Sequence, residues 1–387
     1  PVTAPVTEHL KSICYLDDEN IFIAGSDGAI LHYDGATFDD IEAGTDKNLN
    51  SIEMISPTNG WAAGVEGTVL RCTGGTWAVF PTGDSQRSYN DILAFDESNV
   101  YFISYSLLDG SVLEHWDGTD MTEIHTFSDN MIALAGSGSD NIWVVGGTNS
   151  IAHWDGTAWD TSMATFPESV KLFDIEINDE GNPVVTAVRL PSWDVDMVLE
   201  YIDGMGWQTL FSGYEKRIMT CGINEKRGFA MGSAGRIIEY SIYGWQEVTT
   251  SAASQFNDVV VPDMSTAWAV GDSGTIYHYT EASVNIVIAD AELVATDMLD
   301  VSAIVMNPGE PITGALEFIF MEVYGSFWFW PTWGETAEFV SLNLPTGYED
   351  ETMLFSFEWP SGAGAGELAI WGALLDSQNN ILGYDIE

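Results

Sequence analysis

The fold is decided by the stretch Ala24-Gly25-Ser26-Asp27-Gly28-Ala29-Ile30-Leu31-His32-Tyr33-Asp34-Gly35-Ala36-Thr37-Phe38, because much of the chain repeats it. It places two glycine-containing turn signals around a short apolar run and closes with an aromatic residue. Asp-Gly pairs favour the type I′ turns of β-hairpins, in which both central residues have positive φ. We therefore expect type I′ turns at Asp27-Gly28 and Asp34-Gly35, and a strand on each side of both turns.

The spacing of the copies predicts the architecture. Related segments recur at Ala63–Trp77, Asp109–Met121, Val145–Trp159, Met231–Trp245 and Val270–Tyr279. Equivalent glycines lie 39 residues apart, at Gly28 and Gly67 and again at Gly235 and Gly274. Repeats of about 40–45 residues with four short strands each are typical of propeller blades. We count seven units and predict an all-β chain with a seven-bladed β-propeller over residues 9–282.

The seventh unit lacks the Asp-Gly turn and the closing tryptophan after His278-Tyr279. Residues 1–8 are β-prone but contain two prolines, so they are predicted to form an N-terminal arm. One expectation is that Val2–Thr7 supplies the outer strand of the last blade. The alternative is that Val284–Ala289 fills that place.

The pattern changes at about Ser283. Residues 283–387 contain no lysine or arginine, and their strands lack the glycine rhythm of the preceding units. About a hundred residues with six or seven alternating strands are typical of an immunoglobulin-like sandwich. We predict such a C-terminal domain over residues 283–387.

Both parts show a family resemblance. The units at Ala24–Phe38, Ala63–Trp77, Met231–Trp245 and Val270–Tyr279 resemble those of photosystem II assembly-factor and BNR-type propellers, which repeat Gly-x-x-Gly-x-Ile followed by Gly-x-x-Trp. The tail is similar to sandwich modules that end many secreted bacterial proteins, through Phe327–Trp333 and the segment Leu368-Ala369-Ile370-Trp371. This second resemblance implies export and an extracellular or cell-surface location, whereas a shared propeller fold does not by itself define a function.

The charge balance excludes two classes of partner. The chain has 59 acidic and 11 basic residues, for a formal net charge of −48. Nucleic acids and anionic membranes require clustered lysine and arginine, so neither is an expected partner. Such a charge favours solubility, and adaptation to high salt or to surfaces rich in divalent cations remains an alternative. No apolar run is long enough to insert into a bilayer.

The cysteines and the start of the chain bear on the cellular compartment. Cys14, Cys72 and Cys221 do not form an even disulfide set, and we expect all three to be buried as small hydrophobic residues. A chain that starts at Pro1 without a signal peptide fits a processed, exported protein, and an artificially trimmed sequence would look the same.

No motif in the sequence predicts an enzyme. His32, His115, His153 and His278 share one position on the third strand of their units, away from the central channel, so we expect contacts with a neighbouring blade or with solvent and not a metal. No unit completes the Asp-box of sialidases, and no arginine triad is available to bind a carboxylate. No cofactor is expected.

Acidic residues leave two further possibilities open. Asp194 and Asp196 are weak candidates for Ca²⁺, which binds six to eight oxygens. Carboxylate pairs suited to glycoside hydrolysis are possible by chance alone, and the Asp17-Asp18, Asp39-Asp40 and Glu349–Glu351 groups are expected to be solvated loop charges.

The most unusual apolar feature is the run Phe327-Trp328-Phe329-Trp330, followed by Trp333. Successive residues of a strand face opposite sides, so the two phenylalanines should lie on one face and the first two tryptophans on the other. A sandwich has one inner face, so one of these pairs must pack against the propeller or offer an interaction surface. These five residues, together with Val2 and Val6 of the arm, are the candidate interface.

These observations support three hypotheses of different classes. The first is a secreted, non-enzymatic structural or adhesive protein that self-assembles into a filament or surface layer through its sandwich and its N-terminal arm. The second is a carbohydrate-binding lectin, with glycans or the cell surface as its partner, that uses Trp61, Trp143 and Trp268. The third is an unrecognised glycoside hydrolase with a carboxylate pair in the channel mouth.

Overall fold

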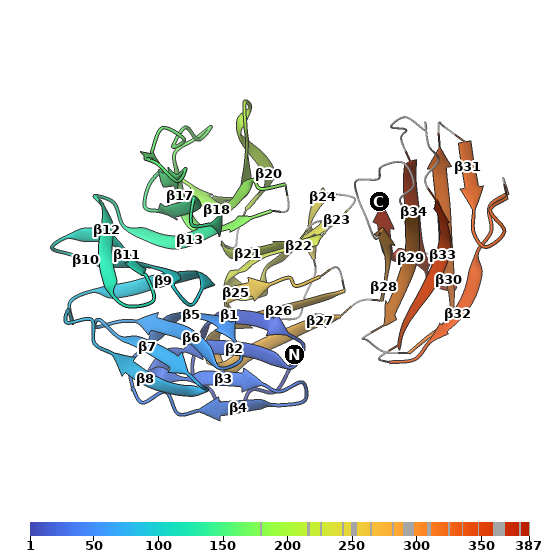
Figure 1. Cartoon of the computed structure of the whole chain (residues 1–387). Coiled ribbons are helices and arrows are strands. Elements are labelled where there is room, and N and C mark those ends of the chain that lie inside the picture. Colours follow the sequence, from blue (N-terminus) through green and yellow to red (C-terminus); the bar gives the residue numbers. More distant parts are fainter. Residues whose placement is uncertain are drawn as a thin grey trace. The chain divides into compact units, whose positions relative to one another are not determined.

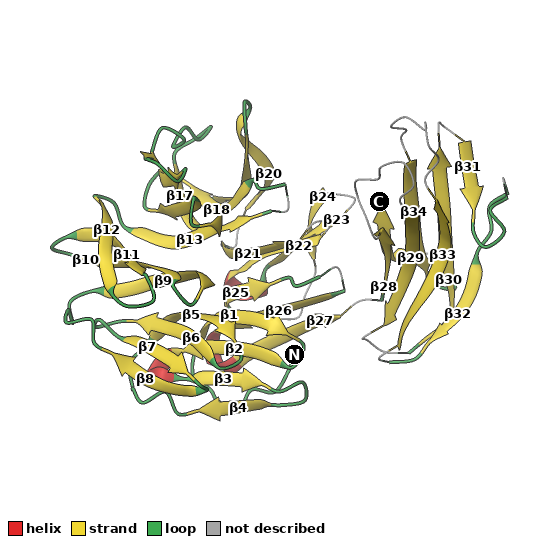
Figure 2. Ribbon diagram, viewed as in Figure 1, coloured by secondary structure: helices red, strands yellow, loops and turns green. Residues whose placement is uncertain are grey.

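The computed structural model describes residues 1–178, 180–214, 217–224, 227–241, 244–248, 254–263, 265–280, 282–288, 298–307, 311–323, 326–334, 336–346, 348–358, 368–378 and 381–386. Its regular structure is almost entirely β-strand (Figure 2). The exceptions are three 3₁₀ turns, η1 (Ser26–Gly28), η2 (Ser233–Gly235) and η3 (Asp272–Gly274). The chain divides into two compact units, one of Pro1–Asp263 with Ala267–His278 and one of Met264–Thr266 with Tyr279–Glu387.

The first unit is built from consecutive antiparallel sheets (Figure 1). The first three are β1 (Leu10–Asp17), β2 (Asn20–Gly25), β3 (Ile30–Tyr33) and β4 (Phe38–Ile41); β5 (Leu49–Ser56), β6 (Asn59–Gly64), β7 (Val69–Thr73) and β8 (Thr76–Phe80); and β9 (Ser88–Asp96), β10 (Asn99–Ser106), β11 (Gly110–Trp116) and β12 (Met121–Phe127). The fourth is β13 (Met131–Gly138), β14 (Asn141–Gly146), β15 (Ser150–Trp154) and β16 (Trp159–Asp160).

The remaining sheets of this unit follow the same order. They are β17 (Val170–Ile177), β18 (Pro183–Arg189), β19 (Val195–Ile202) and β20 (Gly206–Tyr214); β21 (Ile218–Asn224), β22 (Arg227–Gly232), β23 (Ile237–Ser241) and β24 (Gly244–Val248); and β25 (Phe256–Val260), β26 (Thr266–Gly271) and β27 (Thr275–Thr280). Over the described residues this gives six four-stranded sheets and one three-stranded sheet. The multiple four-stranded blades are those of a propeller.

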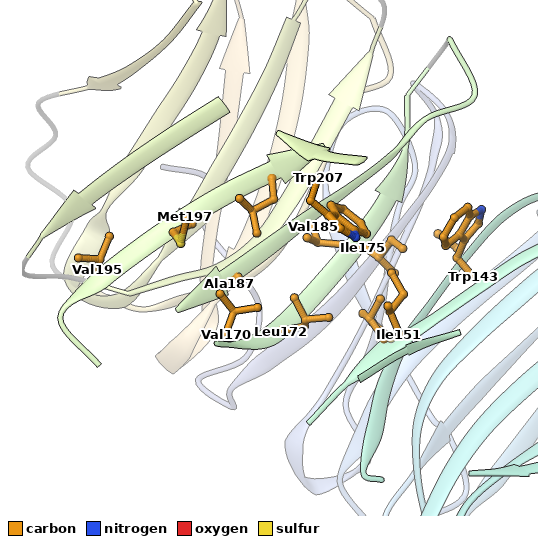
Figure 3. Close-up of a cluster of buried hydrophobic side chains, with 14 residues drawn as sticks. Trp143, Ile151, Val170, Leu172, Ile175, Val185, Ala187, Val195, Met197 and Trp207 are labelled. Carbon is orange, nitrogen blue, oxygen red and sulfur yellow. The ribbon is translucent and has the colours of Figure 1, made fainter. Parts of the chain in front are cut away.

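The blades close into a ring through their first strands. Each of β1, β5, β9, β13, β17, β21 and β25 contacts the first strand of the next blade, and β25 contacts β1. Apolar clusters fill the space between neighbouring blades. In the largest, Trp143 and Ile151 of the fourth blade pack with Leu172, Val185 and Trp207 of the fifth (Figure 3).

The quoted repeat folds largely as expected, with one correction. Asp27 and Gly28 have φ of 54° and 75°, the pair of positive values that a type I′ turn requires. A Cβ at Gly28 would also collide with the carbonyl oxygen of Thr45. At the second turn only Gly35 has positive φ. Asp34 instead accepts hydrogen bonds from the backbone N–H groups of the two residues after Gly35, which makes this an Asx-type turn.

The N-terminal arm lies against the last blade. Val2 forms a single antiparallel bridge with Ile276 of β27, and its N–H donates to the Ile276 carbonyl at 2.8 Å. The alternative segment does not complete that blade, because β28 (Ser283–Ile288) pairs with a strand of the second unit.

The second unit consists of two sheets. One contains β28, β29 (Met298–Asn307) and β33 (Tyr348–Glu358); the other contains β30 (Ile312–Val323), β31 (Ser326–Phe329), β32 (Val340–Leu344), β34 (Leu368–Leu375) and β35 (Ile381–Ile386). Buried side chains from both sheets form one hydrophobic cluster that includes Val284, Val301, Ile319 and Ile370. The two sheets therefore share a single core.

Two general expectations can be compared with the structure. Cys14, Cys72 and Cys221 are buried and free, as predicted. Among the described residues no helix has the length and apolar character needed to cross a bilayer.

Candidate functional sites in the propeller channel and on the second unit

The first strands of the blades line a central cavity of about 410 Å³. Five carboxylates surround it: Glu53, Asp91, Asp174, Glu176 and Asp258. No lysine, arginine or histidine is among its described lining residues. The cavity is thus strongly acidic, and the roles of the carboxylates follow from their hydrogen bonds.

One position of the first strand carries side chains that join several of the blades to the next blade. We call it the clasp position; it follows an irregularity in the pairing with the second strand and is occupied by Ser12, Ser51, Asp91, Ala133, Asp174, Thr220 and Asp258. The Ile52 N–H donates to Ser12 Oγ at 3.2 Å, and the Leu134 N–H donates to Asp91 Oδ2 at 2.8 Å. The Cys221 N–H donates to Asp174 Oδ2 at 3.0 Å.

A clasp also closes the ring. The Ile13 N–H of the first blade donates to Asp258 Oδ2 of the last blade at 2.9 Å. Beside it, Asn257 Nδ2 donates to the Leu10 carbonyl at 2.7 Å. Three of the five channel carboxylates, Asp91, Asp174 and Asp258, therefore hold neighbouring blades together.

The carboxylates of the channel are held in an environment that favours protonation. Burial and then the charge of Asp174 raise the pKa of Asp258 to about 8, although hydrogen bonds from backbone N–H groups oppose the change. Burial, followed by the charges of Asp91 and Asp258, raises the pKa of Glu53 to about 8. Burial also raises the pKa of Asp91 to about 7 and that of Asp174 to about 6. Burial is the largest cause in each case, and neighbouring carboxylates add to it for Asp258, Glu53 and Asp91.

Several of the channel carboxylates therefore have a structural role, which the hydrolase hypothesis did not include. The sequence predicted carboxylate pairs in the channel only as chance occurrences. Three of the carboxylates instead occupy one repeated position of the first strand and accept hydrogen bonds from backbone N–H groups of the next blade. Glu53 and Glu176 lie two residues beyond the clasp position on β5 and β17 and line the same cavity. In the part of the chain that the structure describes, no group of three or more His, Cys, Asp or Glu side chains is arranged to hold a metal ion.

The repeated histidines are half-buried, and their stacking partners lie within their own blades. Each stacks on an aromatic ring of the second strand of its own blade: His32 on Phe22, His115 on Tyr101, His153 on Trp143 and His278 on Trp268, with centroid distances of 4.4, 4.5, 3.9 and 3.8 Å. Cross-strand pairing places these rings directly opposite each other, as at Trp143 and His153.

The tryptophans on which the lectin hypothesis rested are buried. Trp61, Trp143 and Trp268 are only 2%, 4% and 3% exposed. Arg71 covers Trp61, with its guanidinium carbon 5.0 Å from the ring centroid. These rings are unavailable to a sugar, so the lectin alternative loses its proposed binding residues.

The candidate calcium residues are bound by different arginines. Asp194 accepts a hydrogen bond from Arg189 at 3.0 Å. Asp196 is 3% exposed and lies 3.3 Å from Arg236, with a pKa that burial raises to about 6. The structure therefore gives each carboxylate a cationic partner from the chain itself.

The phenylalanines of the candidate interface belong to a larger aromatic group on the five-stranded sheet. We call Phe318, Phe320, Phe327, Phe329 and Trp371 the aromatic face. Phe320 lies 5.9 Å from Phe327 and 5.7 Å from Phe329, and it stacks on Trp371 at 5.6 Å with an interplanar angle of 5°. Phe327 is 45% exposed.

The aromatic face lies on the side of the sheet opposite the core. On β30, Ala315 and Ile319 alternate with Phe318 and Phe320 and are fully buried in the shared core. Trp330 and Trp333 pack against that same core. Trp328, which pairs with Met321, is half-buried. The neighbouring phenylalanines and tryptophans thus point to opposite sides of the sheet.

The two arm residues of the candidate interface are occupied within the chain. Val2 and Val6 pack against a core cluster of the first and last blades that includes Leu10, Trp268 and Ile276. The Gly274 N–H donates to the Glu8 carbonyl at 2.8 Å and fixes the end of the arm. The arm therefore serves the propeller itself in this structure.

Comparisons with known proteins support the fold of the first unit. No family model matches the chain, and no curated protein does so. A solved structure described as YCF48 bound to D1 peptide is 15% identical, with a TM-score of 0.58, over 72% of this chain and 95% of its own. The WD40 β-propeller domain of Doa1 is 12% identical, with a TM-score of 0.53, over 71% of this chain and 94% of its own. The chain therefore contains a β-propeller that resembles these two over about 72% of its length.

Proposed function

We propose that this is a non-enzymatic structural or adhesive protein of the cell exterior, which self-associates through the aromatic face of an immunoglobulin-like C-terminal domain. The observation that carries the proposal is the aromatic face, because it is a contiguous apolar surface on the outer side of a sheet. Monomeric proteins rarely expose such patches unless they are interaction sites. The similarity of the tail to modules of secreted proteins supports the location.

Charge favours a second copy of the chain as the partner. With 59 acidic residues, two copies repel each other over most of their surfaces. On β30, β31 and β34 the side of the aromatic face carries one acidic residue, Glu322. Two copies can therefore meet there with little juxtaposition of carboxylates. Salt that screens the remaining repulsion should strengthen the association.

The test compares oligomeric state in the wild type and two variants. Replacing Phe327 and Phe329 with serine (F327S/F329S) should weaken self-association at least about tenfold, because each substitution removes apolar area from the contact. The matched control is M353S, since Met353 is 57% exposed but lies on the other sheet. Equal association in the wild type and both variants would contradict the proposal.

The acidic cavity supports a second function, the binding of a cationic peptide. The Ycf48 structure is described as bound to a peptide, and it shares this fold. The carboxylates of Glu53 and Glu176 could accept a lysine or arginine side chain. Binding of a lysine-containing peptide should weaken in E176Q and persist in E42Q, which removes an exposed charge elsewhere. Equal binding by the two variants would exclude the channel as the site.

A further inference from the structure

A carboxylate is enclosed in the second unit without a partner for one of its oxygens. Glu317 lies on the core side of β30, between Ala315 and Ile319, and is 3% exposed. Its Oε1 atom is buried and has no hydrogen-bond partner among the residues that the structure describes. Enclosing an ionised carboxylate in this way is costly unless a proton or a cation neutralises it.

Two further oxygen groups approach Glu317 from the opposite sheet. Asp350 and Tyr348 lie on β33 and pair with Val305 and Asn307 of β29. Val305 belongs to the shared core, so these β33 positions point towards β30. Burial raises the pKa of Tyr348, and the charges of Asp350 and Glu317 raise it further. The three groups are therefore electrostatic neighbours. The sequence prediction that Asp350 lies in a loop is wrong, because Asp350 belongs to strand β33.

The chain provides no cation for this cluster within its own domain. Residues 283–387 contain no lysine, arginine or histidine, so the negative charge of Glu317 cannot be compensated by a basic side chain of that segment. Asp350 is exposed and provides an entry route from solvent. Burial and then the charge of Asp350 raise the pKa of Glu317 to about 7, as expected for two carboxylates without a counter-ion.

We propose that Glu317 and Asp350, with the Tyr348 hydroxyl beside them, bind a divalent cation of the calcium type between the two sheets of the C-terminal domain. Ca²⁺ binds carboxylate, carbonyl and water oxygens in flexible geometry, so two carboxylates can hold it while water completes its coordination. The cation neutralises the buried Glu317 and links β30 to β33.

The experiment is calorimetric titration of the full chain with CaCl₂, in about 0.5 M NaCl to screen weak surface binding. Wild type and E322Q should each bind one ion more tightly than the background, because Glu322 lies on the other side of β30. E317Q and D350N should lose that site.

Two results would overturn the site. Binding by E317Q that equals binding by E322Q would mean that the ion sits elsewhere among the acidic residues. No binding above background in the wild type would mean that a proton alone neutralises Glu317. Glutamine has the size of glutamate and removes the buried charge, so E317Q is expected to fold, and its folding is checked by its thermal transition in EDTA.

Discussion

The Asp258 carboxylate accepts a hydrogen bond from the Ile13 backbone N–H at 2.9 Å, and so joins residues that are 245 positions apart in the chain. The bond connects the last blade to the first. It is the ring-closing member of a set in which Ser12, Asp91 and Asp174 bind the backbone of the following blade in the same way. Closure of the propeller thus depends on side chains of the channel as well as on packing between blades.

Removing this clasp should destabilise the propeller. D258A leaves the Ile13 N–H without an acceptor, which costs about 1–3 kcal/mol of unfolding free energy. D258N keeps an acceptor oxygen and should retain most of the stability. Chemical denaturation followed by circular dichroism measures both, with D40A as a control at an exposed strand position. Equal stability of D258A and D40A would show that the bond contributes nothing.

The channel carboxylates predict an unusual pH dependence. The pKa values of Asp91, Glu53 and Asp258 are raised to about 7, 8 and 8, so the folded state keeps protons that the unfolded state releases near pH 4. Stability therefore falls as the pH rises, and the part of this loss between about pH 7.5 and pH 8.5 lies above the range in which histidines titrate. The midpoint of denaturation should decrease over that range in the wild type and less steeply in D258N. A midpoint that rises with pH would contradict this reading.

One blade lacks a clasp, and the structure predicts how to add it. In the second blade Ser51 Oγ donates to Asp91 Oδ1 at 2.9 Å and accepts the Ile92 N–H at 3.2 Å. The equivalent residue of the fourth blade is Ala133, and Asp174 occupies the same position in the fifth. A133S should reproduce the pair and stabilise the protein by about 0.5–1.5 kcal/mol.

Thermal unfolding of A133S checks this, with A152S as the control. Ala152 is fully buried on the third strand of the same blade, away from the clasp position. Its hydroxyl should bring no gain. A lower midpoint for A133S than for the wild type would show that the fourth blade cannot accept the clasp.

The stacked histidines predict a loss of stability in acid. Burial against Trp268 and its surroundings lowers the pKa of His278 to about 4. Because the unfolded chain binds a proton near pH 6.5 and the folded chain does not, this histidine contributes stability that is lost as the pH falls from about 6.5 to about 4. Proton NMR titration should show His278 neutral at pH 5.5. A midpoint near 6.5 would mean that the stack is open to water.

The propeller could be predicted from the sequence because its signal is repeated. The Asp-Gly turns and their 39-residue spacing, as from Gly28 to Gly67, locate four strands per unit without any long-range information. The turn at Asp34 was predicted less well. An Asp-Gly pair is compatible with two turn types, and the choice here depends on whether the aspartate side chain binds the backbone.

The functional sites were harder to predict. Asp91, Asp174 and Asp258 stand at one repeat position, but serine, threonine and alanine occupy it in other blades, so the sequence alone shows no motif. Strand alternation was sufficient to separate Phe327 and Phe329 from Trp330. The burial of Glu317 was not predictable, because it requires the pairing of β30 with two strands that lie far from it in the chain.

The most direct test of self-association is sedimentation velocity of the full chain over a hundredfold range of concentration, at low and at high salt. Self-association through the aromatic face predicts a sedimentation coefficient that rises with concentration and a larger shift at high salt. Both effects should be reduced in F327S/F329S but not in M353S. A single monomeric species for the wild type at every concentration and salt would contradict the proposal that the aromatic face joins copies of this chain.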